Sequence, residues 1–137
     1  MELTQEHIIT VSNLKELPPL LEQHTDFTVW VLDKVRKFHK DLRFNFGTDL
    51  ANTCLMVMDG LVESLYIGKG RVRADKLQEV SICLEQLRIH LRMAWKLRLI
   101  NASALHYATG CLQKEGKMLG GWIKSETNSR KTEKYES

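Results

Sequence analysis

Three cationic residues, Arg88, Arg92 and Lys96, recur at four-residue spacing near the middle of the sequence. On a helix this spacing would place them in one ridge about 12 Å long, beside the apolar face. The planar fork of an arginine can bond two phosphate oxygens at once, so such a ridge suits a polyanion. Pairing with nearby acids, such as Glu79 and Glu85, would explain any one of these cations equally well.

Charge is distributed unevenly along the chain, whose formal net charge is +3. Residues 34–98 carry thirteen Lys and Arg against seven Asp and Glu, whereas residues 1–33 carry one against six. This asymmetry indicates a polyanionic partner or subunits that meet through opposite charges. Besides the ridge, the cations predicted to bind nucleic acid or a partner are Arg36, Lys37, Lys40, Arg43, Arg71 and Arg73.

Motifs for catalysis, metals and cofactors are weak. Residues 68–71 (GKGR) superficially suggest a phosphate loop but lack the spacing of a Walker or dinucleotide motif. No HxxxH or ExxH pair occurs, and no Ser, Cys or Lys has an identifiable base nearby in sequence. We therefore expect no catalytic residue, no metal and no cofactor, and a protein that is not an enzyme. The scattered residues Cys54, Cys83 and Cys111 are typical of reduced, buried thiols.

The elements that must position these cations are helices. Both prolines, Pro18 and Pro19, lie near the start, and apolar residues then recur every three or four positions within 20–38, 44–65, 77–98 and 105–123. Gly68 and Gly70 are expected to end the second helix, and Asn101 to separate the last two. The pattern predicts an all-α, up-down-up-down antiparallel four-helix bundle over residues 18–125, with an N-terminal arm (1–17) and a flexible C-terminal tail (126–137).

Two glycines inside the fourth helical pattern, Gly120 and Gly121, would cost about 1 kcal/mol each relative to alanine. Such a cost is tolerated where another backbone must approach closely. Together with Trp122 they are candidates for packing, either in the core or between subunits. No apolar run reaches the roughly 20 residues of a membrane span, and the N-terminus lacks a signal-peptide pattern, so we expect a cytoplasmic protein without membrane contact.

Three segments resemble one bacterial family of four-helix bundles. They are residues 37–47 (KFHKDLRFNFG), 91–100 (LRMAWKLRLI) and 116–125 (GKMLGGWIKS), and the likeness extends over roughly residues 17–125. The family is that of Avd, the accessory variability determinant of diversity-generating retroelements, together with the ribosomal RNA intervening-sequence proteins.

This resemblance implies a homopentameric barrel with a basic surface. It further implies an accessory protein that binds a reverse transcriptase and RNA or DNA during mutagenic reverse transcription, and Arg43 is the basic residue on the shared motif. An intervening-sequence protein, with a structural or RNA-binding role and no polymerase partner, remains an alternative. A third is a small helical-bundle enzyme acting on an anionic metabolite.

Overall fold

The computed structural model describes residues 18–136, and the side chains of residues 18–128. Helix α2 (Pro19–Val35) begins directly after Pro18. Pro19 is accepted as its first residue because the N–H groups of the first turn have no partner within the helix, so a proline there loses no hydrogen bond. A short helix α3 (Lys40–Leu42) and a π-helical turn η2 (Arg43–Gly47) lead into α4 (Thr48–Tyr66). Helices α5 (Arg71–Lys96) and α6 (Ala102–Glu136) complete the described chain, which contains no strand.

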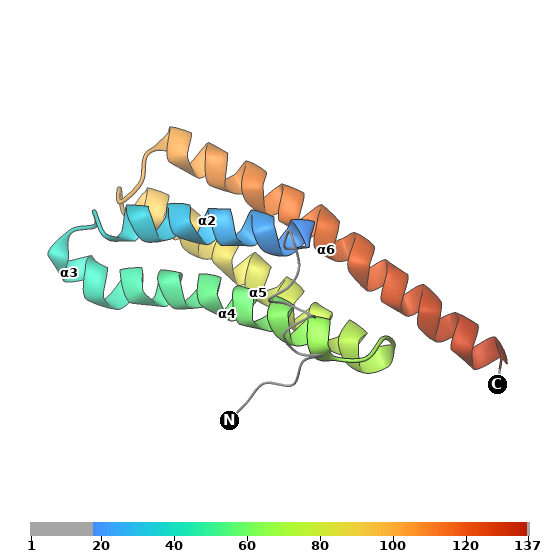
Figure 1. Ribbon diagram of the computed structural model, residues 1–137. Coiled ribbons are helices and arrows are strands. Elements are labelled where there is room, and N and C mark those ends of the chain that lie inside the picture. The colour runs from blue at the N-terminus through green and yellow to red at the C-terminus, as the bar shows by residue number, and fades with distance from the viewer. Residues whose placement is uncertain (1–17, 137) are drawn as a thin grey trace, which may run out of the picture.

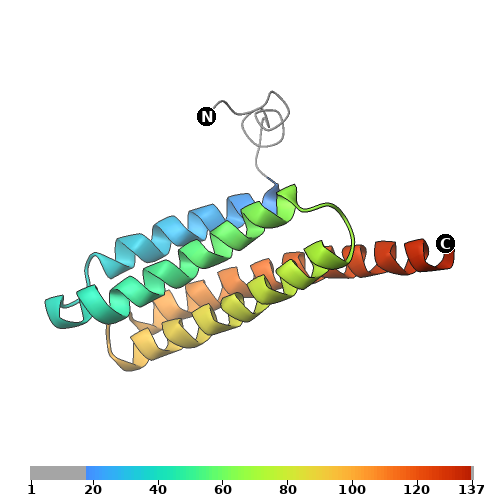
Figure 2. The same cartoon turned by 90° about the horizontal axis from the view of Figure 1, so that it is seen from below.

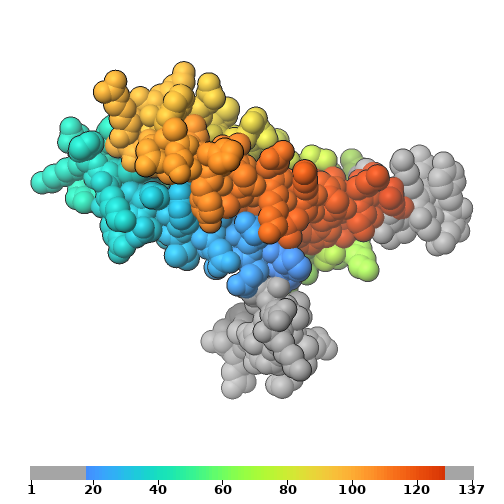
Figure 3. All heavy atoms as spheres, turned by 90° about the horizontal axis from the view of Figure 1, so that it is seen from above, coloured from blue at the N-terminus to red at the C-terminus, as the bar shows by residue number. Residues whose placement is uncertain are grey.

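The four long helices form a ring in which α2 contacts α4, α4 contacts α5, α5 contacts α6 and α6 contacts α2. Successive helices run in alternating directions (Figure 1; Figure 2). The predicted all-helical fold with four long helices is therefore confirmed. Seen from the side that α6 covers, α6 lies between α5 and α2 (Figure 3).

The core is built from the inward stripe of each long helix. Its largest fully buried apolar side chains are Phe27, Leu50, Leu77, Leu87 and Leu119, which come from all four helices. Burying these side chains supplies the main free energy that holds the helices together. No helix within residues 18–136 combines the length and the apolar character that crossing a bilayer would require.

Asn101 starts a helix as expected, whereas α4 ends at Tyr66 and Gly70 lies at the start of α5 instead of at the end of α4. Gly70, before α5, has φ 118°, a backbone conformation that side chains disfavour. Asn101 caps α6, since its Oδ1 accepts the amide N–H of Ala104 at 2.8 Å. The end of α5 departs from the usual pattern, because Arg98 takes the left-handed conformation (φ 62°) at a position where glycine is common.

One predicted boundary differs from the structure. Helix α6 continues to Glu136, past residue 125, where the bundle was expected to end and a tail to begin. Glu126 explains part of the difference, because its buried carboxylate contacts the turn between α4 and α5. The predicted arm, residues 1–17, lies outside the described residues.

Candidate nucleic-acid interface

The join between α2 and α4 and the join between α5 and α6 lie at the same end of the bundle (Figure 1; Figure 2). Residues 33–43 and 92–98, which form these joins and the helix ends beside them, carry eight Lys and Arg but only two acids. We call these two segments the basic end. It unites cations that are about fifty residues apart in the sequence.

At the first join, Arg36 and Lys37 both pair with Asp33, one turn earlier on α2. Hydrogen bonds from Lys37 and Arg36 lower the pKa of the Asp33 carboxyl. Both cations remain largely exposed, and pairs of this kind contribute little to stability in water. A phosphate could therefore replace Asp33 as their partner at small cost.

Arg43 lies beside an exposed aromatic ring. Its guanidinium is 4.9 Å from the centre of the Phe44 ring, and its Nη1 donates to the carbonyl of Arg36 at 3.5 Å. Phe44 is 69% exposed, and neither Arg43 nor the neighbouring Lys40 has an ion-pair partner in the described part of the chain. An arginine and a free aromatic face side by side can stack on an unpaired base while contacting its phosphate.

The π-helical turn explains why Phe44 faces outward. The sequence pattern assigned Phe44 to the apolar stripe, but of the two phenylalanines in this turn only Phe46 packs inward, stacking on Phe38 with ring centres 6.4 Å apart. The extra residue of a π turn shifts the helical register, and such turns are frequent at functional sites. A regular 3.6-residue period places Phe44 on the inward face and therefore does not predict this exposed ring.

The predicted ridge on α5 is present, and its members differ in their contacts. Arg88 is 54% exposed and donates to Glu85 at 2.8 Å, whereas Arg92 and Lys96 have no ion-pair partner among residues 18–128. Arg88 also lines a groove of about 520 Å³ between α5 and α6, whose far wall includes Lys117. Arg92 and Lys96 belong to the basic end, so this half of the ridge has side chains that are available to bind an anion.

The turn between α4 and α5 lies at the opposite end of the bundle. Arg71 is exposed there and faces Asp75 at 3.8 Å. Arg73 is only 14% exposed: it bonds Glu126 at 3.1 Å, donates to the carbonyls of Leu65 and Ile67, and lies 5.9 Å from the ring of Trp122. Unlike Arg71, Arg73 uses its donors within the chain, where they tie the turn to α6.

The glycine pair on α6 has no close neighbour among the residues that the structure describes. Nothing lies within 4 Å of where a Cβ would stand at Gly120 or Gly121, and both residues are exposed. The close approach that these glycines suggested is thus absent from the described bundle. Trp122, by contrast, is half-buried and packs against the core.

The core holds a polar pair that no motif revealed. His24 Nδ1 lies 2.5 Å from Glu115 Oε1, His24 Nε2 lies 2.8 Å from the carbonyl oxygen of Cys54, and both side chains of the pair are 0% exposed. In the sequence, His24 lies within an apolar stripe, and nothing near it marks Glu115 as its partner. Burial, with the charge of Glu115 as a second cause, raises the pKa of the Cys54 thiol to about 12. Because both side chains are fully buried, substrates cannot reach the pair, and its hydrogen bonds instead join α2 to α4 and α6 in the core.

No group of three or more His, Cys, Asp or Glu that could hold a metal ion occurs within the described residues. Comparison of the sequence and the fold with family models, curated proteins and solved structures finds no match.

Proposed function

We propose that this chain is a non-catalytic accessory protein that binds nucleic acid through the basic end. The observation that carries the proposal is that four cations without an ion-pair partner among residues 18–128, Lys40, Arg43, Arg92 and Lys96, belong to one end of the bundle, where Arg43 lies beside the exposed ring of Phe44. Cations without a carboxylate partner lose least when they bind phosphate, because no existing pair must be broken. The ring adds a stacking surface that single strands can use and regular duplexes cannot.

The biological setting we propose is that of an Avd-type protein in the cytoplasm. The chain would hold a reverse transcriptase together with its template RNA or complementary DNA. Support for this setting is the resemblance of three sequence segments, two of which include residues of the basic end. A structural role in binding RNA without a polymerase, as in the intervening-sequence proteins, would use the same surface.

We further propose that the chain assembles as a homo-oligomer, with five copies as the resemblance implies. Support comes from apolar side chains on the outer face of α5, where Ile82, Ile89 and Met93 are exposed at seven- and four-residue spacing. The bare glycine backbones of α6 would let a neighbouring helix approach closely. Several copies of one modest cationic patch would multiply phosphate contacts and so strengthen binding.

Charge reversal at the basic end tests the proposal. In the Arg92→Glu/Lys96→Glu variant we expect the affinity for single-stranded RNA to fall by a factor of at least about 10, measured by fluorescence anisotropy. Arg71→Glu is the matched control, because Arg71 is an exposed α5 arginine at the opposite end of the bundle. Equal losses in both variants, or none in the double variant, would contradict binding at the basic end.

A further inference from the structure

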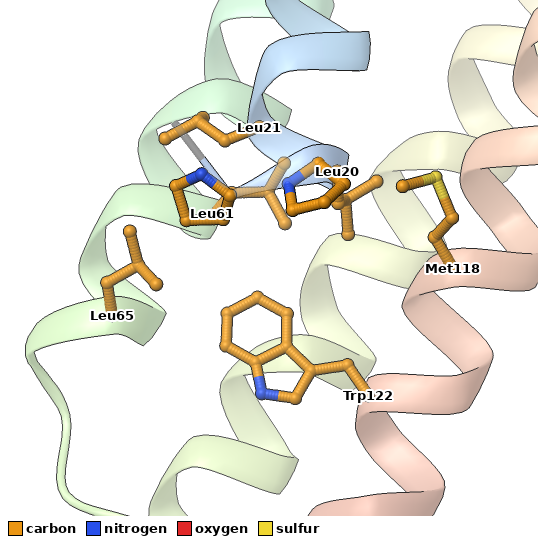
Figure 4. Close-up of a pocket in the computed structure, with 8 residues that line it drawn as sticks. Leu20, Leu21, Leu61, Leu65, Met118 and Trp122 are labelled. Carbon is orange, nitrogen blue, oxygen red and sulfur yellow. The ribbon is translucent and has the colours of Figure 1, made fainter. Parts of the chain in front are cut away.

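An apolar pocket of about 310 Å³ opens at the end of the bundle opposite the basic end. Three helices contribute to it, and the indole of Trp122 projects from α6 toward the helix that carries Leu65 (Figure 4). Its walls are almost wholly apolar and consist of Pro18, Pro19, Leu20, Leu21, Leu61, Leu65, Met118 and Trp122.

The pocket exists because the helices end at different levels. Helix α2 starts at Pro19 and α4 ends at Tyr66, whereas α6 runs on past Trp122 to Glu136. Pro19 is exposed, and Leu65, Met118 and Trp122 are only half-buried. Apolar surface of this kind gains free energy when another apolar group removes it from water.

We propose that residues 1–17 of the same chain cover this pocket, with Leu14 and Leu17 entering it. The segment joins the described chain at Pro18, which is itself a wall of the pocket, so Leu17 is attached at the rim. An extended chain spans up to about 3.3–3.6 Å per residue, so Leu14 also reaches any part of the pocket. Further apolar residues of the segment are Leu3, Ile8, Ile9 and Val11.

Charge supports the same placement. The segment carries Glu2, Glu6 and Glu16 against a single lysine, Lys15. The turn that follows Leu65 and the start of α5 carry the exposed cations Lys69 and Arg71, at the same end of the bundle as the pocket. An acidic segment lying over the pocket would be attracted to basic side chains at this end, and this attraction would weaken as salt is added.

The size of the pocket also favours side chains of the chain over a free ligand. At about 310 Å³ it stands at the lower limit of the roughly 300–1,000 Å³ typical of small-molecule sites. An attached segment has the further advantage of a high effective concentration, since the chain already holds it at the rim. A free apolar ligand or the arm of a second copy are the rival occupants.

Photo-cross-linking of the full chain tests the proposal. With p-benzoylphenylalanine in place of Leu14, irradiation should join residue 14 to Met118 or Trp122, as identified by mass spectrometry. The same probe in place of Ser12, a polar neighbour, is the matched control and should give at least several-fold less of this product. A mixture of ¹⁵N-labelled and unlabelled protein shows whether the joined residues belong to one chain. Adducts that avoid the pocket, or that form only between chains, would overturn the proposal.

Quenching of Trp122 fluorescence by acrylamide gives an independent measurement. In a full-length background with Trp30→Phe and Trp95→Phe, Leu14→Ser/Leu17→Ser should raise the quenching constant about twofold or more, because the indole loses its cover. The control variant Ser12→Ala/Asn13→Ser should leave it unchanged, and circular dichroism verifies that every variant is folded. Equal quenching constants in the two variants would refute cover by the arm, as would a difference that appears only at high protein concentration.

Discussion

Replacing the buried pair of His24 and Glu115 gives the sharpest test of how this bundle is held together. In Glu115→Leu, the imidazole Nδ1 loses the carboxylate that lies 2.5 Å away in the native protein, at a site that is 0% exposed. Removing one member of a fully buried pair typically costs about 3–5 kcal/mol, because the other member stays desolvated and unpaired. Total stabilities are about 5–15 kcal/mol, so the single variant should be close to unfolding.

The double variant His24→Leu/Glu115→Leu should recover much of this loss. Well-packed apolar residues often replace a buried pair with no cost, or with a gain of about 1–4 kcal/mol. Two features favour recovery here: Glu115 Oε2 is buried without a hydrogen-bond partner among residues 18–128, and both members of the pair are buried in a core that is otherwise mostly apolar. The carbonyl of Cys54 loses the imidazole contact in both His24 variants, which limits the gain.

Urea denaturation followed by circular dichroism at 222 nm measures these free energies of unfolding. The order expected is a large loss in Glu115→Leu, a large loss in His24→Leu and a clearly smaller loss in the double variant. Glu85→Leu serves as the surface control, because Glu85 pairs with Arg88 in solvent and its removal should shift the midpoint little. The reasoning is that removing one partner costs free energy because the other is left buried and unpaired. A loss in the double variant equal to the sum of the two single losses would refute it.

Three further predictions concern single residues. A Cβ at Gly60 would lie 2.5 Å from Val80 on α5, so Gly60→Ala should destabilise the bundle by about 1–3 kcal/mol, whereas Gly116→Ala, where nothing lies within 4 Å, should raise the thermal midpoint. The Cys54 thiol, with its pKa raised to about 12 by burial, should react with a disulfide reagent at pH 8 only after unfolding, and rapid native reaction would contradict its burial. Burial acts to raise the pKa of Glu126, but hydrogen bonds to its carboxylate prevail and lower the pKa below the usual 4.5. The stability that this carboxylate contributes is therefore complete above pH 4.5 and is lost as the pH falls below that value. Glu126→Gln should remove this part of the acid dependence of unfolding.

The helices could be predicted because the signals that define them are local. Apolar residues three and four positions apart identify each inward face, Gly70 identifies a chain reversal, and Asn101 identifies a helix start. Each of these signals lies within a few residues of the structure that it specifies. Only the end of α6 was misplaced, because its terminal turns lack an apolar stripe.

The contacts that join distant segments could not be predicted in the same way. His24 and Glu115 are 91 positions apart, and Arg73 and Glu126 are 53 apart, so neither pairing has a signature in a sequence window. Arg73 looked equivalent to Arg71 in the sequence, but α6 passes beside the one and leaves the other in solvent. Phe44 escaped notice for a different reason, since the π turn breaks the period on which the prediction relied.

The central claim is that cations on the outside of the bundle bind nucleic acid. The salt dependence of RNA binding tests this claim most directly. For single strands, the slope of log affinity against log salt concentration is about −0.7 per phosphate contact. Replacing Lys40, Arg43, Arg92 and Lys96 by alanine should make this slope shallower by up to about 2.8 and weaken binding at low salt, with the helical content unchanged. A quadruple variant with the affinity and the slope of the parent protein would contradict the claim.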